Sequence, residues 1–179
     1  DMAVHMLIAG FGGQGVLFAG KIVAYTGMIE EKQVSWLPSY GPEMRGGTAN
    51  CSVCIDEKPI GCPIVLEPQT LIVMNRPSYD KFVDAVAPGG IMIYDSTLID
   101  AECSRTDITV AAVPATKMAN DNGLHGLSNI IMLGQTLKQT QFCSLDVLKE
   151  AMKKCIPPRK QHLLEPNLKA LQLGYEYSC

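Results

Sequence analysis

Short apolar runs and longer amphipathic segments follow one another along most of the chain. The first apolar run, residues 6–9, ends in a glycine-rich turn, and a long apolar segment, residues 16–28, follows the turn. In that segment small or apolar residues recur at helical spacing, which is typical of a helix that lies close against a sheet. The start of the chain is therefore predicted to form a strand, a tight turn and a helix.

The same reading extends to the rest of the chain. Further strands are predicted at residues 34–37, 48–55, 71–74, 91–94 and 106–113. Helices are predicted at residues 78–85, from a cap at Ser128 to about Thr136, from a cap at Ser144 to the prolines at 157–158, and from about Pro166 onward. Residues 114–127 are rich in Asn, Asp and Gly and are predicted to form turns. This order predicts an α/β fold: a Rossmann-like, mainly parallel sheet with helices on both faces and a helical C-terminal section.

The glycine-rich turn is the first candidate site. Gly10, Gly12 and Gly15 fit the G-x-G-x-x-G pattern at the first strand-to-helix junction, where backbone N–H groups can approach an anion at the positive end of a helix. The alternative is that the glycines only allow a tight reversal and close packing. A nicotinamide site also needs a carboxylate after the second strand. Residues 35–38 (Ser-Trp-Leu-Pro) stand there, which disfavours a standard NAD site.

Residues 38–47, PSYGPEMRGG, form the second candidate site. Two prolines and three glycines make a regular element unfavourable, so a loop is predicted. Arg45 offers a planar, permanently charged group for a phosphate or carboxylate. The alternative is a local surface pair between Glu43 and Arg45, which would contribute little.

Cysteine, histidine and strand-end polar residues are the remaining chemical candidates. Cys51 and Cys54 have C-x-x-C spacing, but residues three apart in a strand point to opposite faces, so buried, unreactive thiols are favoured over a metal or iron–sulfur site with Cys62. Asn75 and Asp95 follow predicted strands, where they either contact a ligand or cap the next helix. His125 is interpreted as a polar loop residue.

Composition narrows the class of protein. The 179 residues are 47% hydrophobic, enough for the core of one domain, and the formal net charge of -3 disfavours nucleic-acid and membrane-surface partners. No apolar run approaches the roughly 20 residues that span a bilayer, and no signal-like segment begins the sequence. A cytoplasmic protein is expected. Seven widely scattered cysteines then indicate reduced thiols.

Four segments carry a resemblance to a known family. They are GFGGQGVLFAGKI (residues 10–22), VSWLPSYGPEMRGGTANCSV (34–53), MNRPSYDKF (74–82) and NLKALQLGYE (167–176). Together they make the chain resemble the gamma subunit of 2-oxoacid:ferredoxin oxidoreductases, nearly from end to end, and most of all that of the 2-oxoglutarate enzyme, with the 2-oxoisovalerate enzyme next. The resemblance implies that residues 1–179 are a single pyruvate/ketoisovalerate oxidoreductase gamma-type catalytic domain.

The resemblance implies a subunit with no cofactor of its own. In such complexes thiamine diphosphate and Mg²⁺ lie in the alpha and beta subunits, and [4Fe-4S] clusters lie in beta or in a small delta subunit. The complex decarboxylates a 2-oxoacid, reduces ferredoxin and transfers the acyl group to coenzyme A. Alpha, beta and delta subunits are therefore the implied partners, and ferredoxin is reached through the complex. Homodimerisation of the isolated chain is left open.

The same resemblance carries over site residues at matching motif positions. In the turn these are Gly12, Gly13, Gln14 and Gly15, and in the loop Ser39, Tyr40, Gly41, Pro42, Glu43, Met44, Arg45, Gly46 and Gly47. They are expected to contact a ligand or a neighbouring subunit, with the turn and Arg45 packing against the thiamine-bearing subunits and shaping the coenzyme A entry. The sequence departs from the commoner pattern at residues 124–128, so His125 receives no role.

Two other classes of protein remain as alternatives. A stand-alone dinucleotide-binding protein would explain the glycines and would bind NAD or a flavin by itself. A redox or metal protein built on Cys51, Cys54 and Cys62 would show visible absorbance or bound metal.

Overall fold

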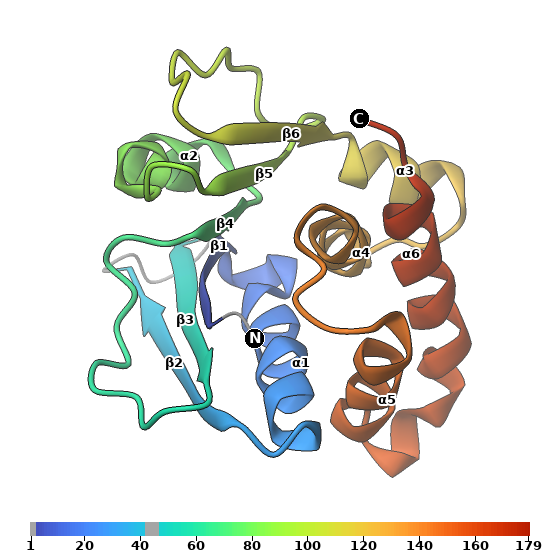
Figure 1. Ribbon diagram of the computed structural model, residues 1–179. Coiled ribbons are helices and arrows are strands. Elements are labelled where there is room, and N and C mark those ends of the chain that lie inside the picture. The colour runs from blue at the N-terminus through green and yellow to red at the C-terminus, as the bar shows by residue number, and fades with distance from the viewer. Residues whose placement is uncertain (1–2, 42–46) are drawn as a thin grey trace.

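The computed structural model describes residues 3–41 and 47–179 (Figure 1). Its strands are β1 (Val4–Phe11), β2 (Gln33–Tyr40), β3 (Thr48–Asp56), β4 (Thr70–Val73), β5 (Ile91–Asp95) and β6 (Thr109–Val113). Its helices are α1 (Val16–Ile29), α2 (Arg76–Phe82), α3 (Ala115–Asp121), α4 (Ser128–Thr140), α5 (Leu145–Cys155) and α6 (Leu164–Glu176). Three short 3-10 segments complete the order: η1 (Gly12–Gln14), η2 (Val83–Ala85) and η3 (Pro158–Leu163). In this part of the chain no helix is long and apolar enough to cross a membrane.

The sheet has six strands in the order β2-β3-β1-β4-β5-β6. The pairs β1–β4, β4–β5 and β5–β6 are parallel, whereas β3 is antiparallel to both β1 and β2. Because β1 and β2 both run opposite to β3, they run in the same direction, and β3 is the one reversed strand among those described. The predicted mainly parallel α/β sheet is confirmed.

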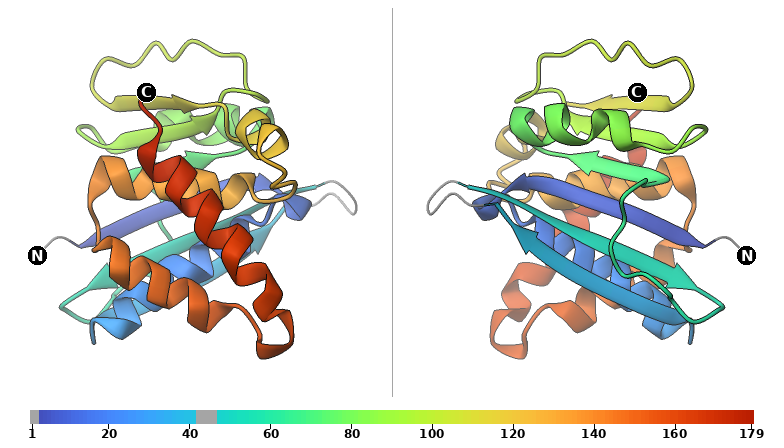
Figure 2. Two further views of the ribbon diagram at one scale, coloured as in Figure 1. Left: turned by 90° about the vertical axis from the view of Figure 1, so that its right-hand side faces the viewer. Right: turned by 90° about the vertical axis from the view of Figure 1, so that its left-hand side faces the viewer.

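Helices cover both faces of this sheet, as predicted (Figures 1 and 2). The larger core lies between one face and helices α1, α3, α4, α5 and α6. The smaller core lies on the other face, where α2 and the segment after β5 cover residues such as Leu7, Leu71 and Met92. The irregular segment 57–69 also lies on this second face, in front of β2 and β3 in the right view of Figure 2. A hydrogen bond from the Val65 N–H to the Ser52 hydroxyl (3.0 Å) connects it to β3.

Helices α4 and α6 cross with their backbones in direct contact. A Cβ placed on Gly174 would meet the carbonyl of Ile131, and one placed on Gly134 would meet the carbonyl of Leu171. Glycine at both positions therefore permits this close crossing. It forms the centre of the helical C-terminal section.

Two predictions about helices were wrong in detail. Residues 114–127 contain helix α3, because Ala115 and Ala119 repeat at helical spacing and are buried, while the polar residues that suggested turns belong to its end. Ser128 is the first residue of α4 and provides no side-chain cap; Leu127 holds the cap position. By contrast, Ser144 does cap α5, since its hydroxyl accepts the Val147 N–H at 3.1 Å.

Candidate functional site

The glycine turn lies at the carboxyl end of β1 and is braced by Gln14. The Gln14 side-chain carbonyl accepts the Phe11 N–H (2.7 Å), and its amide nitrogen donates to the Met74 carbonyl (2.8 Å) just after β4. A Cβ on Gly10 would collide with the Gln14 carbonyl oxygen, so Gly10 makes room for this brace. Gln14 thus joins the ends of β1 and β4, and both the oxygen and the nitrogen of its side-chain amide are hydrogen-bonded within the chain.

Gly15 closes the turn with a left-handed backbone (φ 73°) and leads into α1. Its carbonyl accepts the side-chain N–H of Asn129 at 3.0 Å, which ties the turn to the first turn of α4. Asn129 lies 114 residues later in the chain. No local pattern in the sequence marked it, because its role depends on how α4 packs against α1.

Gly12 and Gly13 are the exposed part of the turn. No atom lies within 4 Å of a Cβ built on Gly13, and the Gly12 N–H donates to the carbonyl of Gly47 at 3.0 Å. The Gly41 N–H donates to the Thr48 carbonyl at 2.7 Å, which closes the base of the second motif. The two predicted motifs therefore meet at one edge of the sheet, through residues 35 positions apart.

The second motif is only partly described. Ser39 and Tyr40 belong to β2, so the prediction that residues 38–47 begin as a loop was wrong at this end: Pro38 pairs with Cys51 within the sheet. An edge strand tolerates proline because half of its backbone N–H groups have no strand partner. Glu43, Arg45 and Gly46, with Pro42 and Met44, lie outside the described residues.

The sheet topology places this edge at a switch point and argues against a nicotinamide site. Strands β1 and β4 are neighbours in the sheet. The chain after β1 continues to β2 on one side of this pair, whereas the chain after β4 continues to β5 on the other side. Open α/β sheets bind ligands at the point between two such strands. In a nicotinamide-binding sheet the second strand lies next to the first. Here β3 lies between β1 and β2, and β2 ends in Ser39 and Tyr40 rather than in a carboxylate.

Exposed aromatic residues flank the two motifs. The side chain of Tyr40 is 70% exposed at the end of β2, and Phe11 is 38% exposed at the end of β1. Tyr40 pairs with Ala49 and Phe11 pairs with Thr48, and because consecutive residues of β3 point to opposite faces, the two aromatic side chains lie on opposite faces of the sheet. Each face of the sheet thus presents one exposed aromatic residue near the turn, and aromatic residues are enriched at protein–protein interfaces.

Asn75 and Asp95 follow β4 and β5, and both have structural contacts. The Asn75 side-chain oxygen caps α2 by accepting the Ser78 N–H at 2.9 Å. The fully buried Asp95 accepts the Thr97 N–H (3.1 Å) and the Thr116 hydroxyl (2.6 Å), which ties β5 to α3. Of the two interpretations left open by the sequence, capping is confirmed for Asn75, whereas Asp95 is not the cap residue of α3, where Pro114 holds that position. His125 is exposed and contacts Asn120 in its loop, at 2.8 Å.

The cysteines of β3 lie on opposite faces of the sheet, as the strand period predicts. The Cys51 thiol donates to the Val16 carbonyl of α1 (3.5 Å), whereas the Cys54 thiol is directed at the carbonyl of Cys62 (3.9 Å). Among residues 3–41 and 47–179 no three His, Cys, Asp or Glu side chains converge. Because the Cys51 and Cys54 thiols lie on opposite faces of the sheet, the two do not fit as joint ligands of one metal or cluster.

Burial makes several of these thiols poor nucleophiles. It raises the pKa of Cys51 and of Cys143 to about 12 and that of Cys155 to about 11. We expect iodoacetamide at neutral pH to modify the exposed Cys62 in the folded chain and to leave these three unmodified, as measured by peptide mass spectrometry. Rapid modification of Cys51 without unfolding would contradict this.

The same shifts give a pH dependence of stability. A thiol whose pKa is higher in the folded chain than its ordinary value of 9.0 stabilises the fold fully below that value. This contribution is lost as the pH rises through 11 to 12. The melting temperature is therefore expected to fall between pH 9 and pH 11, and serine in place of Cys51 is expected to reduce that fall.

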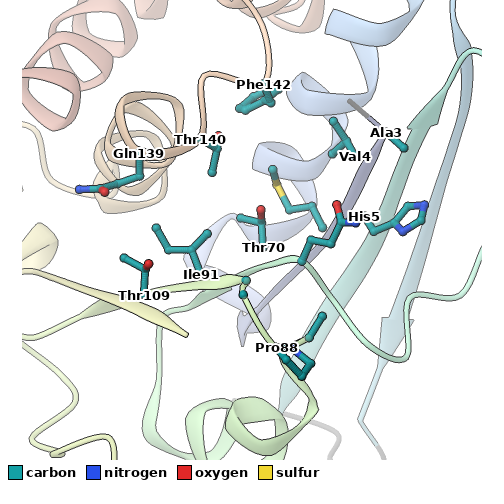
Figure 3. Close-up of a pocket in the computed structure, with 15 residues that line it drawn as sticks. Ala3, Val4, His5, Thr70, Pro88, Ile91, Thr109, Gln139, Thr140 and Phe142 are labelled. Carbon is teal, nitrogen blue, oxygen red and sulfur yellow. The ribbon is translucent and has the colours of Figure 1, made fainter. Parts of the chain in front are cut away.

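A separate cavity of about 540 Å³ lies at the opposite, amino-terminal edge of the parallel strands (Figure 3). Its wall includes Thr70, Ile91 and Thr109 from the starts of β4, β5 and β6, and Gln139 and Phe142 from the end of α4 and beyond. None of its lining residues is Lys, Arg, Asp or Glu. It offers hydroxyl and amide groups but no fixed charge, which makes it a poor site for a carboxylate or phosphate.

Comparisons with known proteins give consistent matches. The family model described as "Pyruvate ferredoxin/flavodoxin oxidoreductase" matches residues 5–177. The ketoisovalerate oxidoreductase subunit VorA of Methanothermobacter thermautotrophicus is 40% identical over 177 residues, which are 98% of this chain and 36% of that protein. The 2-oxoglutarate synthase subunit KorC of Methanocaldococcus jannaschii is 32% identical over 98% of this chain and 94% of its own length. This chain thus spans about a third of the first relative and nearly all of the second.

Solved structures agree with the sequence relatives. The crystal structure of a keto/oxoacid ferredoxin oxidoreductase gamma subunit from Geobacter sulfurreducens superposes with a TM-score of 0.82 at 27% identity. The match covers 97% of this chain and 96% of that one. The similarity therefore extends over the whole fold.

Proposed function

The chain belongs to the pyruvate ferredoxin/flavodoxin oxidoreductase family, and on that premise we propose that residues 1–179 form one domain that serves as the gamma subunit of a 2-oxoacid:ferredoxin oxidoreductase complex. The complex would oxidatively decarboxylate 2-oxoglutarate or a related 2-oxoacid, reduce ferredoxin and form the acyl-coenzyme A and CO₂. The full-length match to a 2-oxoglutarate synthase subunit supports the first substrate. The higher identity to a ketoisovalerate oxidoreductase subunit keeps a branched-chain 2-oxoacid as the related one.

The proposed role of this chain is to supply a shaped surface, while thiamine diphosphate, Mg²⁺ and [4Fe-4S] clusters are held by alpha, beta and delta subunits. Those groups supply the decarboxylation and the electron transfer when bound. The cysteines of this chain fit that assignment of cofactors to other subunits, because the thiols of Cys51 and Cys54 point to opposite faces of β3. Gly12, Gly13 and the exposed Tyr40 would contact a neighbouring subunit or border the coenzyme A entry.

The observation that carries this proposal is the hydrogen bond between the Gly12 N–H and the Gly47 carbonyl. It holds the two family motifs together at the switch point of the sheet, with Phe11 and Tyr40 exposed beside them. Gln14 and Gly15 fix the turn from behind through Met74 and Asn129. An edge that is internally braced and exposes one aromatic residue on each face of the sheet is suited to docking against a large partner.

Co-production of the chain with the proposed alpha, beta and delta subunits tests the proposal. Tyr40→Ala is expected to reduce the amount of purified complex about tenfold or more, because large buried aromatics dominate interfaces. Arg45→Ala is expected to weaken assembly or to raise the apparent KM for coenzyme A. Val110→Ala, at an exposed apolar residue of the other edge strand, is the matched control and should change neither quantity.

The readouts are complex yield by size exclusion and coenzyme A-dependent ferredoxin reduction over a panel of 2-oxoacids. All three variants should keep the melting temperature of the parent chain. Unchanged assembly and kinetics in both Tyr40→Ala and Arg45→Ala would refute the proposed surface. Turnover of a 2-oxoacid by the chain alone would refute the subunit role.

A further inference from the structure

Helix α1 is apolar around its whole circumference, although this chain covers only part of it. Lys21 is the one charged residue within Val16–Ile29. A helix without a polar face is normally buried on all sides. One side of α1 packs against the sheet, whereas four residues at helical spacing keep part of their surface open to solvent: Phe18, Lys21, Tyr25 and Met28. This open stripe is the feature that needs an explanation.

The stripe lies between two cavities, and Lys21 lines both of them. Figure 1 shows α1 between strand β2 and helix α5. A cavity of about 560 Å³ on the β2 side is lined by Tyr25, Met28 and Trp36. A cavity of about 430 Å³ on the α5 side is lined by Phe18, Lys160 and Leu163. We call the surface that joins them the α1 surface, and its main residues are Lys21, Tyr25, Met28, Trp36, Lys160 and Leu163.

Large apolar side chains stand open on the α1 surface. Met28 is 57% exposed, Leu163 39% and Trp36 37%. The Trp36 indole is held against α1, because a Cβ added to Gly20 would lie only 3.0 Å from the indole nitrogen. Aromatic and methionine side chains are enriched at protein–protein interfaces, and tryptophan most often carries their binding energy. The α1 surface therefore has the composition of an interface.

The charge on the α1 surface is positive. Lysines 21, 32 and 160 line the two cavities, and no Asp or Glu of the described residues does. Lys32 pairs with Glu57 at 3.8 Å, whereas Lys21 and Lys160 form no ion pair within the described part of the chain. The Lys21 ammonium lies 5.8 Å from the centre of the Tyr25 ring, so its charge stays on the open stripe. A partner with carboxylates would complement this surface.

The same charges disfavour a second copy of this chain as the occupant. In a symmetric dimer the same surface meets itself, so the ammonium groups of Lys21 and Lys160 would meet like charges without a carboxylate between them. A head-to-tail contact with another face would leave the α1 surface of the last copy open, and copies would continue to add. A different protein avoids both problems.

We propose that the α1 surface is the docking site for a segment of another subunit that carries apolar side chains and at least one carboxylate. The apolar side chains lie against Met28 and Trp36, and the carboxylate pairs with Lys21. This inference rests on the proposed function, since the partner is a subunit of that complex. It adds a contact along α1 to the one proposed at the glycine turn and Tyr40.

Met28→Glu tests the apolar part of this contact. Glutamate is a good helix former at an exposed position, but here it would meet the partner's carboxylate. The yield of complex from co-production with the alpha, beta and delta subunits is expected to fall about tenfold or more by size exclusion. Ile64→Glu is the matched control, because Ile64 is 53% exposed and belongs to the segment 57–69 on the other face (Figure 2). Equal losses in the two variants would overturn the docking site.

Lysine variants test the charged part. Lys21→Gln is expected to weaken binding of the chain to the other subunits about tenfold, measured by biolayer interferometry, and Lys21→Arg should restore most of it. Lys169→Gln removes the same charge from exposed α6, outside both cavities, and should have no effect. Carbodiimide joins ammonium groups to carboxylates that contact them. Peptide mass spectrometry of the treated complex should show Lys21 joined to another subunit, and unlinked Lys21 would overturn the ion pair.

The outcomes separate this inference from the proposed function. A complex that assembles and reduces ferredoxin, but is insensitive to Met28→Glu and Lys21→Gln, would overturn the docking site and leave the subunit role intact. A chain that never joins the other subunits would contradict both. Light scattering of the isolated chain covers the remaining case: a dimer that Met28→Glu converts to a monomer would show that a second copy occupies the surface, which overturns the proposed partner.

Discussion

Replacement of Gly174 with alanine is expected to lower the free energy of unfolding by about 2 to 4 kcal/mol. A methyl group at this position would occupy the space of the Ile131 carbonyl, which belongs to the backbone of α4. Backbone cannot move aside as a flexible side chain can. Helices α4 and α6 would have to separate, and the apolar contacts at their crossing would be lost.

The direction of this effect is diagnostic. In an exposed helix, alanine is more favourable than glycine by about 1 kcal/mol, so the substitution would normally stabilise the chain. Chemical denaturation followed by circular dichroism measures the change. Lys169→Ala, on the exposed surface of the same helix, is the control and should stay within about 0.5 kcal/mol of the parent. Stability equal to or above the parent in Gly174→Ala would show that the crossing is looser than described.

Gly15→Ala is expected to cost about 2 to 3 kcal/mol, through two separate effects. The residue has a left-handed backbone, which is unfavourable for alanine. Its methyl group would also displace the amide of Asn129, which donates to the Gly15 carbonyl. Both the glycine turn and its attachment to α4 are affected, so weaker assembly with partner subunits is expected as well.

Gly13→Ala provides the matched control for Gly15→Ala. It lies two residues earlier in the same turn, and no atom stands within 4 Å of its added Cβ. Thermal melting of both variants should show a large decrease for Gly15→Ala and little change for Gly13→Ala. Equal decreases would mean that the turn is sensitive to any side chain, rather than to the conformation and contact of Gly15.

The elements that the sequence predicted well depend on local chemistry. A glycine turn between a buried strand and a small-residue helix, and a serine three residues before the Val147 N–H, are recognisable because neighbouring residues determine them. The α/β class followed from the alternation of such elements. For the same reason the sequence offers capping as one role for Asn75, whose side-chain oxygen accepts the N–H of Ser78 three residues later.

The features that were missed depend on contacts between distant parts of the chain. Nothing near residue 38 shows that its strand lies at the edge of the sheet, where proline is accepted, or that β3 separates it from β1. Helix α3 was hidden because its polar end resembles a turn, while its buried alanines are small. Asn129 donates a hydrogen bond to a turn more than a hundred residues earlier in the chain, and a local sequence pattern cannot predict such a contact.

Pro38 affects how the edge of the sheet behaves in the chain on its own. Strand β2 is an edge strand of the sheet. An exposed edge strand can pair with strands of other molecules, which leads to aggregation. A proline within that strand lacks one N–H, so an incoming chain would lose a hydrogen bond in the middle of the new ladder. We therefore expect Pro38 to weaken the addition of a further strand at this edge, where Tyr40 is exposed.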